Sequence, residues 1–213
     1  MLRQLAAATL LCGTAFAADT APIVSASGDS PAFQLVANGL SGSGNQIDPG
    51  PKGDVMAGDM VLAFQKMSLK DVVAKLGGAT HITEENGVGW VCYISPEPTP
   101  VTIWFGAFYT SDGAMTLSGV GLEAAAPPES AGCTTLADPL IVTTGAPGLG
   151  ATTAELDATF GKAADAEPDG TVAYFFGSEN QPDGINALTK ERKYRMVDGV
   201  AVAISAGIFN ELQ

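Results

Sequence analysis

Two stretches of the chain follow the same plan. Residues 68–92 read SLKDVVAKLGGATHITEENGVGWVC, and residues 152–176 read TTAELDATFGKAADAEPDGTVAYFF. They align without a gap at an offset of 84 residues. Few identities survive, but both stretches carry a helix cap, an apolar stripe, a glycine, a polar loop and an aromatic strand. A chain built twice from one unit usually offers a surface rather than a catalytic pocket.

Each copy predicts one short helix. Ser68 with Asp71, and Thr152 with Glu155, fit the S/T-x-x-D/E pattern of a capped helix start. Apolar residues recur behind each cap at helical spacing, and a glycine then ends each run.

Six longer strands are predicted from runs rich in β-branched and aromatic residues. Asp-Gly pairs at 112–113 and 198–199 predict tight hairpins, so neighbouring strands must be antiparallel. Shorter strands are expected within residues 31–40 and 136–143. The six longer strands cover residues 88–94, 101–109, 115–122, 171–176, 191–197 and 200–208.

These elements predict an α+β fold of two tandem units, each an antiparallel sheet packed on one side by a short helix. The expected boundaries are 1–18 for a signal peptide, 19–58 for an N-terminal segment with a Gly/Pro-rich loop, 59–123 for the first unit, 124–150 for a linker and 151–213 for the second unit. Strand alternation predicts that Val88, Trp90, Cys92, Val101, Ile103, Phe105, Tyr174, Phe176, Tyr194, Met196, Val200, Val202 and Ile204 face the helices.

The opposite face of the sheet is the candidate binding site. The same alternation places there Tyr93, Trp104, Phe108 and Phe175, with Lys193 and Arg195 from the one basic cluster. Large aromatic side chains are favoured at binding hot spots. Either this face is open and binds a partner, or residues 32–40 partly cover it. The two cations are also compatible with a plain solvated face. A site is expected where the two copies differ.

Residues 1–18 have the pattern of a secretory signal peptide. Arg3 provides the positive start, an apolar run follows, and residues 15–17 form an A-x-A cleavage signal. Cys12 lacks the small preceding residues of a lipoprotein signal, so we expect it to leave with the peptide. We therefore expect a periplasmic or secreted protein without a transmembrane segment.

Export would leave two cysteines, Cys92 and Cys133. An even pair in an oxidising compartment predicts one disulfide, with two buried free thiols as the alternative. The formal net charge is −13. An acidic chain repels phosphate backbones, so we expect no nucleic-acid partner, whereas a basic protein partner would be suited.

The sequence offers little catalytic chemistry. His81 is the only histidine, and we interpret it as a solvated loop residue rather than a triad member. Residues 165–170 (DAEPDG) open like a calcium loop, but Phe176 stands where such a loop needs a glutamate. We expect no catalytic residue, no metal and no cofactor.

The capped helix, the Leu-Gly or Phe-Gly stop, the aromatic strand beginning at Trp90 or Tyr174, and the Asp-Gly hairpin together resemble the SmpA/OmlA and β-lactamase-inhibitor-protein-like superfamily. The resemblance covers about two thirds of the chain. It implies two such units in tandem and an exported non-enzyme that binds other proteins. The chain differs from the lipoprotein branch at Cys12, and it has only two mature cysteines instead of one pair per unit.

The resulting functional hypothesis is an exported protein-binding module, an inhibitor or adaptor of a periplasmic or secreted protein. A carboxylate-dependent envelope hydrolase is the first alternative, and it requires two acids that converge in a cleft. A carrier of a small ligand or lipid is the second, and it requires an enclosed cavity between helix and sheet.

Overall fold

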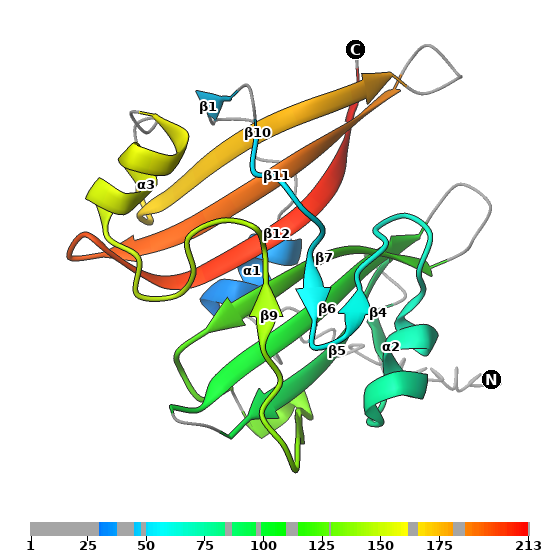
Figure 1. The fold of residues 1–213 in the computed structure, drawn as a ribbon. Helices are drawn as coiled ribbons and strands as arrows, with labels where there is room; N and C mark the ends of the chain where they lie inside the picture. Colours follow the sequence, from blue (N-terminus) through cyan, green and yellow to red (C-terminus); the bar gives the residue numbers. More distant parts are fainter. Residues whose placement is uncertain are drawn as a thin grey trace, which may run out of the picture.

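One nine-stranded sheet forms the body of the protein (Figure 1). The computed structural model describes residues 30–37, 45–47, 50–83, 87–96, 99–109, 115–127, 129–161, 166–180 and 186–212. The strand order in the sheet is β1-β10-β11-β12-β7-β6-β5-β4, and β8 also pairs with β5. Its strands are β1 (Asn45–Gln46), β4 (His81–Thr83), β5 (Val88–Ser95), β6 (Val101–Tyr109), β7 (Met115–Glu123), β8 (Thr134–Thr135), β10 (Thr171–Asn180), β11 (Asn186–Val197) and β12 (Val200–Leu212).

A small three-stranded sheet and three short helices complete the described part of the chain. The small sheet has the order β3-β2-β9. Its strands are β2 (Met56–Ala57), β3 (Met60–Val61) and β9 (Val142–Thr143). The helices are α1 (Pro31–Ala37), α2 (Leu69–Leu76) and α3 (Thr153–Phe160), with one 3-10 turn, η2 (Glu129–Ala131).

The predicted α+β fold of two tandem units is wrong, because both halves belong to one sheet and strand far outweighs helix among the described residues. The last strand of each half, β7 and β12, pair antiparallel through residues 119–123 and 203–207. In two separate units each of these strands would have left an unpaired edge. Joining them satisfies the backbone groups of both edges at once.

The internal duplication is nevertheless visible in the order of elements. The bounds of α2 and α3 differ by the same 84 residues as the sequence repeat. Both capping boxes are formed, with Ser68 bonded to Asp71 and Thr152 bonded to Glu155. The residue before each helix bridges the last strand of its half, as Ser68↔Thr116 and Thr152↔Val200. The hairpin at 198–199 is confirmed, with positive φ at both residues, whereas residues 112–113 lie outside the described ranges.

The segment 31–37 is a helix, so the strand expected within residues 31–40 is wrong. Ser30 accepts a hydrogen bond from the Phe33 amide on its hydroxyl (3.1 Å), which is the bond of an N-cap. Pro31 occupies the first helical position, where a missing N–H costs nothing. The linker strand predicted at 136–143 is reduced to the two residues of β9.

Both faces of the large sheet are covered. On one face α2, α3 and the small sheet pack over a single apolar core. On the other face α1 inserts Phe33 between Trp90 and Trp104, with ring centroids 5.4 and 5.1 Å away. The largest fully buried side chains of the first core include Tyr93, Ile103, Phe105, Leu117, Leu156, Tyr174 and Tyr194.

The predicted facing is wrong for the three β5 residues, which lie on the α1 face, and for Val200, which is exposed. It is right for the residues that join the core beneath α2 and α3, namely Val101, Ile103, Phe105, Tyr174, Tyr194, Met196 and Ile204. Cys92 lies directly opposite Trp104 in the sheet, so the two share the α1 face. Val91 and Tyr93 instead point toward α2. Every position from 89 to 93 is buried. Along β5, therefore, hydrophobicity does not reveal which residues face which side of the sheet.

The predicted disulfide is confirmed. Cys92 on β5 is bonded to Cys133, and their Cα atoms lie 4.5 Å apart. The bond ties the segment containing η2 and β8 to the sheet beside α1. Disulfides persist in oxidising compartments, so the bond indicates a location outside the cytoplasm. No helix within the described ranges is long and apolar enough to cross a membrane. Residues 1–18, including Cys12, lie outside those ranges.

Replacing both cysteines, as C92A/C133A, should lower the free energy of unfolding by about 4 kcal/mol, because the bond closes a loop with a sequence separation of 41. Urea denaturation of the variant and of the wild type measures the difference. Wild-type protein unfolded in reductant should show a similar loss. An unchanged denaturation midpoint in the variant would show that the crosslink adds no stability.

Candidate functional site

The sheet face opposite α2 and α3 forms a seat for α1. Figure 1 shows α1 behind the sheet where β12 and β7 meet, and the helix contacts β6, β7, β11 and β12. Beneath α1 the strands carry glycines, so the helix packs directly on their backbone. A Cβ added at Gly106 would collide with Val36, and one at Gly121 would lie 2.7 Å from the Ala32 carbonyl oxygen. The α1 seat comprises Trp90, Trp104, Gly106, Gly119, Gly121, Glu123 and Lys193.

The N-terminal end of α1 is held by a buried carboxylate. Glu123 on β7 accepts hydrogen bonds from the Ser30 hydroxyl (2.7 Å), the Ala32 amide (3.2 Å) and the Trp104 indole N–H (3.1 Å). Glu123 is buried, with only 1% of its surface exposed. A negative charge at this end complements the helix dipole, and three donors offset the cost of burying it.

The C-terminal end of α1 is held by a buried cation. Lys193 on β11 donates from Nζ to the Leu35 carbonyl oxygen at 3.5 Å and forms an ion pair with Glu191 at 3.0 Å. Both charged residues are at least nine-tenths buried. Burial raises the pKa of Glu191, while the charge of Lys193 opposes that shift. The seat therefore presents an anion to the start of α1 and a cation to its end.

The predicted binding residues do not form one open patch. Trp104 and Lys193 lie on the predicted face, but both are buried beneath or beside α1. Tyr93 lies on the other face, where its hydroxyl donates to the Gly77 carbonyl (2.6 Å). Phe175 is buried and Phe108 half-buried. The alternative that residues 32–40 partly cover the predicted face is confirmed for residues 32–37, which belong to α1, whereas residues 38–40 lie outside the described ranges.

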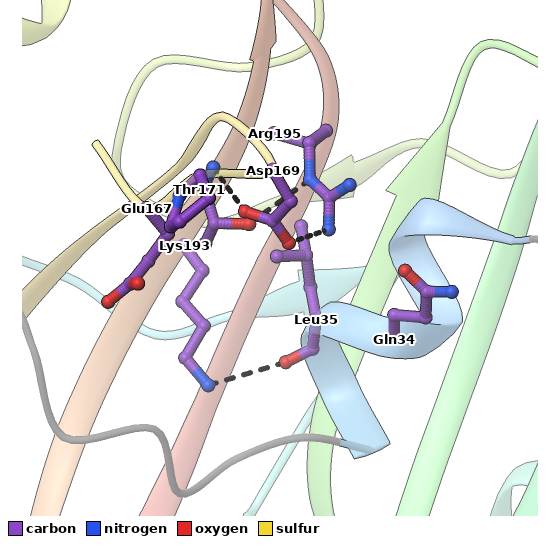
Figure 2. A pocket seen from close by; sticks show the side chains of 8 residues that line it. Gln34, Leu35, Glu167, Asp169, Thr171, Lys193 and Arg195 are labelled. Carbon is purple, nitrogen blue, oxygen red and sulfur yellow. Dashed lines mark hydrogen bonds and ion pairs between the residues drawn. The ribbon is translucent and has the colours of Figure 1, made fainter.

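A charged pocket opens beside the C-terminal end of α1 (Figure 2). Its volume is about 290 Å³. It brings the two predicted basic residues, Lys193 and Arg195, together with two acids from one loop. The lining residues are Gln34, Leu35, Glu167, Pro168, Asp169, Thr171, Lys193 and Arg195.

One wall of the charged pocket is an internal ion pair. Arg195 bonds the Asp169 carboxylate at 2.6 Å and the Thr171 hydroxyl at 3.1 Å. Burial acts in the opposite direction, but hydrogen bonds from Thr171 and the charge of Arg195 hold the pKa of Asp169 below its usual range. Asp169 thus belongs to a turn, in which it accepts a hydrogen bond from the Thr171 amide. Asp165 lies outside the described residues, and among those described no three His, Cys, Asp or Glu side chains form a metal-binding group.

His81 is not the solvated loop residue that the sequence indicated. It lies on β4, is half-buried and stacks on Trp90 with ring centroids 5.6 Å apart. Its ring also lies against Gly132, where a Cβ would approach the imidazole to 2.8 Å. The histidine therefore packs at the edge of the α1 core beside the disulfide.

The outer face of the small sheet exposes apolar side chains. Val61 is 45% exposed and Ile141 is 70% exposed. Their strand neighbours Met60 and Val142 point inward to the core, so Val61 and Ile141 point outward. Met56 pairs with Val61 on β3 and with Thr143 on β9, and it is partly exposed. We call Met56, Val61 and Ile141 the small-sheet patch.

Sequence reasoning missed the carboxylate and the glycines of the α1 seat. A signal for the glycines was available, since Gly106, Gly119, Gly121 and Gly207 all fall inside predicted strands. Glycine within a strand often marks a close approach of another backbone. For Glu123 there was no local signal, because a charged residue at a strand end is normally exposed.

The chain matches no protein-family profile, no curated protein and no solved structure.

Replacing Gly106 with alanine should destabilise the fold by about 1–3 kcal/mol, because the added methyl group forces Val36 out of the seat. Gly148→Ala is the matched control, since a Cβ there has no atom within 4 Å. Adding Val36→Ala to Gly106→Ala should recover part of the loss by making room. Equal stability of the two single variants in urea would contradict the seat.

Glu123→Gln should lower the free energy of unfolding by about 2 kcal/mol or more, because an amide replaces the carboxylate that accepts three hydrogen bonds. The exposed Glu129 provides the control substitution, Glu129→Gln, which should change stability little. The measurement is again the urea midpoint. The assigned role of Glu123 is wrong if both variants have the same urea midpoint.

Proposed function

We propose that the protein is an exported, non-enzymatic module that binds another protein in the periplasm or outside the cell, as an inhibitor or adaptor. The observation that carries the proposal is the small-sheet patch. Val61 on β3 and Ile141, one residue before β9, are exposed, whereas their neighbours Met60 and Val142 pack on the core. Exposed apolar patches often mark interaction sites.

The charge around the patch supports a basic partner. Asp54, Asp59 and Asp138 are exposed and lie within three residues of a patch member in the sequence. Lys75 compensates Asp59 in part, through an exposed ion pair at 3.1 Å. The whole chain carries a formal charge of −13. Complementary charge speeds association and disfavours acidic competitors.

The proposed binding surface is not the large-sheet face, since α1 covers the centre of that face over β6, β7, β11 and β12. The resemblance to the β-lactamase-inhibitor-protein-like superfamily, whose members bind other proteins, agrees with the proposed activity. The charged pocket favours a small polar ligand as the second candidate. Its volume of about 290 Å³ and its charged lining do not suit a lipid.

A photo-crosslinking residue placed at position 141 should capture the partner in the native exporting cell. Position 82 is the matched control, because Ile82 is also large, apolar and 49% exposed but lies on β4. We expect a crosslinked species at 141 and none at 82. The captured protein, once purified, should bind the wild-type chain and lose affinity for the Ile141→Asp variant. Equal capture at both positions, or unchanged binding by Ile141→Asp, would refute the patch as the binding surface.

A further inference from the structure

The charged pocket beside α1 has the size of a site for a small molecule. It is built from three parts of the chain, with Gln34 and Leu35 on α1, residues 167–169 in the loop before β10, and Lys193 and Arg195 on β11. Its volume of about 290 Å³ lies at the lower end of the range of about 300–1,000 Å³ for ligand pockets. A ligand of this pocket is therefore small.

The charges of the pocket select the kind of ligand. Two cations, Lys193 and Arg195, and two carboxylates, those of Glu167 and Asp169, line it. Lys193 is buried and Arg195 is half-buried, whereas Asp169 is exposed. A ligand with a single charge meets groups of its own sign here, and such contacts reduce affinity. A ligand that carries one positive and one negative group complements both kinds of lining residue.

Arg195 has donors to offer to the negative group of a ligand. Its Nε donates to the Thr171 hydroxyl at 3.1 Å, and its Nη2 donates to the Asp169 carboxylate at 2.6 Å. These two atoms form one edge of the planar guanidinium, and no other described residue bonds the edge formed by Nη1 and Nη2. A carboxylate fits such an edge through two parallel hydrogen bonds. Thr171 and Asp169 hold the guanidinium in position, which reduces the cost of binding.

Glu167 can accept the positive group of a ligand. Figure 2 shows the loop 167–169 with only the Asp169 carboxylate turned toward Arg195. Among the described residues no cation forms an ion pair with Glu167. The backbone of Glu167 bonds that of Thr171 and that of Gly170, each at 2.8 Å. The loop therefore presents this carboxylate from a fixed position.

We propose that the charged pocket binds a small zwitterion, a free amino acid or a dipeptide. Its carboxylate would contact the Nη1–Nη2 edge of Arg195, and its ammonium group would contact Glu167. Leu35 and Pro168 provide apolar contact for the carbon atoms of the ligand. The pocket and the small-sheet patch share no residue, so this inference does not depend on the proposed protein partner.

Nuclear magnetic resonance titration of the ¹⁵N-labelled full chain tests the proposal. Glycine, 4-aminobutyrate and glycylglycine are the zwitterions, with three different separations of charge. N-acetylglycine lacks the ammonium group and glycinamide lacks the carboxylate, so these two are the controls. At least one zwitterion should bind saturably and at least about tenfold tighter than both controls, because each control loses a charge-assisted hydrogen bond. The shifted amides should fall within residues 34–35, 167–171 and 193–195. No saturable binding of any zwitterion, or equal binding of a control, would overturn the proposal.

The variant Glu167→Gln tests the ammonium contact without removing a hydrogen bond of the fold. The best zwitterion should bind about tenfold more weakly or worse, because its ammonium group loses the charge of Glu167. N-acetylglycine should bind no more weakly than to the wild type, because a repelling carboxylate is gone. Glu129→Gln, an exposed position on η2, should leave both affinities unchanged. A folded Glu167→Gln variant that keeps the wild-type affinity for the zwitterion would also overturn the proposal.

Discussion

The seating of α1 across the junction of β7 and β12 is the contact on which the rest of the structure depends. Five residue pairs join these two strands and hence the two halves of the sheet. The helix crosses that junction, with one end bonded to Glu123 on β7 and the other to Lys193 on β11. Both contacts are buried, where charge pairing is far stronger than at the surface. The helix thus links the halves through electrostatic contacts as well as through apolar packing.

The glycines beneath α1 explain how a short helix can make these contacts. Side chains between packed elements normally hold their backbones apart, and glycine, which lacks a Cβ, allows another backbone to approach closely. With Gly106 and Gly121 beneath it, α1 approaches closely enough for its Ala32 amide to meet Glu123. Glycine weakens strands by entropy and lost packing. The Phe33 ring packs between Trp90 and Trp104 in the same region, and the apolar surface it buries offsets the packing that the glycines lack.

Much of the secondary structure follows from local sequence, whereas the covering of the sheet does not. The caps at Ser68 and Thr152 and the strand β6 were predictable because cap chemistry and β-branched runs act over a few residues. For α1 the signal was present in Ser30 and Pro31, but a short stretch such as residues 32–36 (AFQLV) fits a strand as well as a helix. The joining of the halves depends on strand edges far apart in sequence, which no local pattern encodes.

The duplication and the single helix together explain where the two copies diverge. In the β7–β12 ladder Gly121 pairs with Ser205, and these positions are 84 residues apart. The junction therefore has an approximate two-fold axis through this pair, and α1 lies directly over Gly121. A helix has two different ends, so one helix on a two-fold axis must meet different chemistry on each side. Accordingly, Glu123 in the first copy corresponds to Gly207 in the second, and only the first copy binds the helix start. The sequence analysis expected a binding site where the two copies differ. At this junction the copies differ because one of them binds the start of α1.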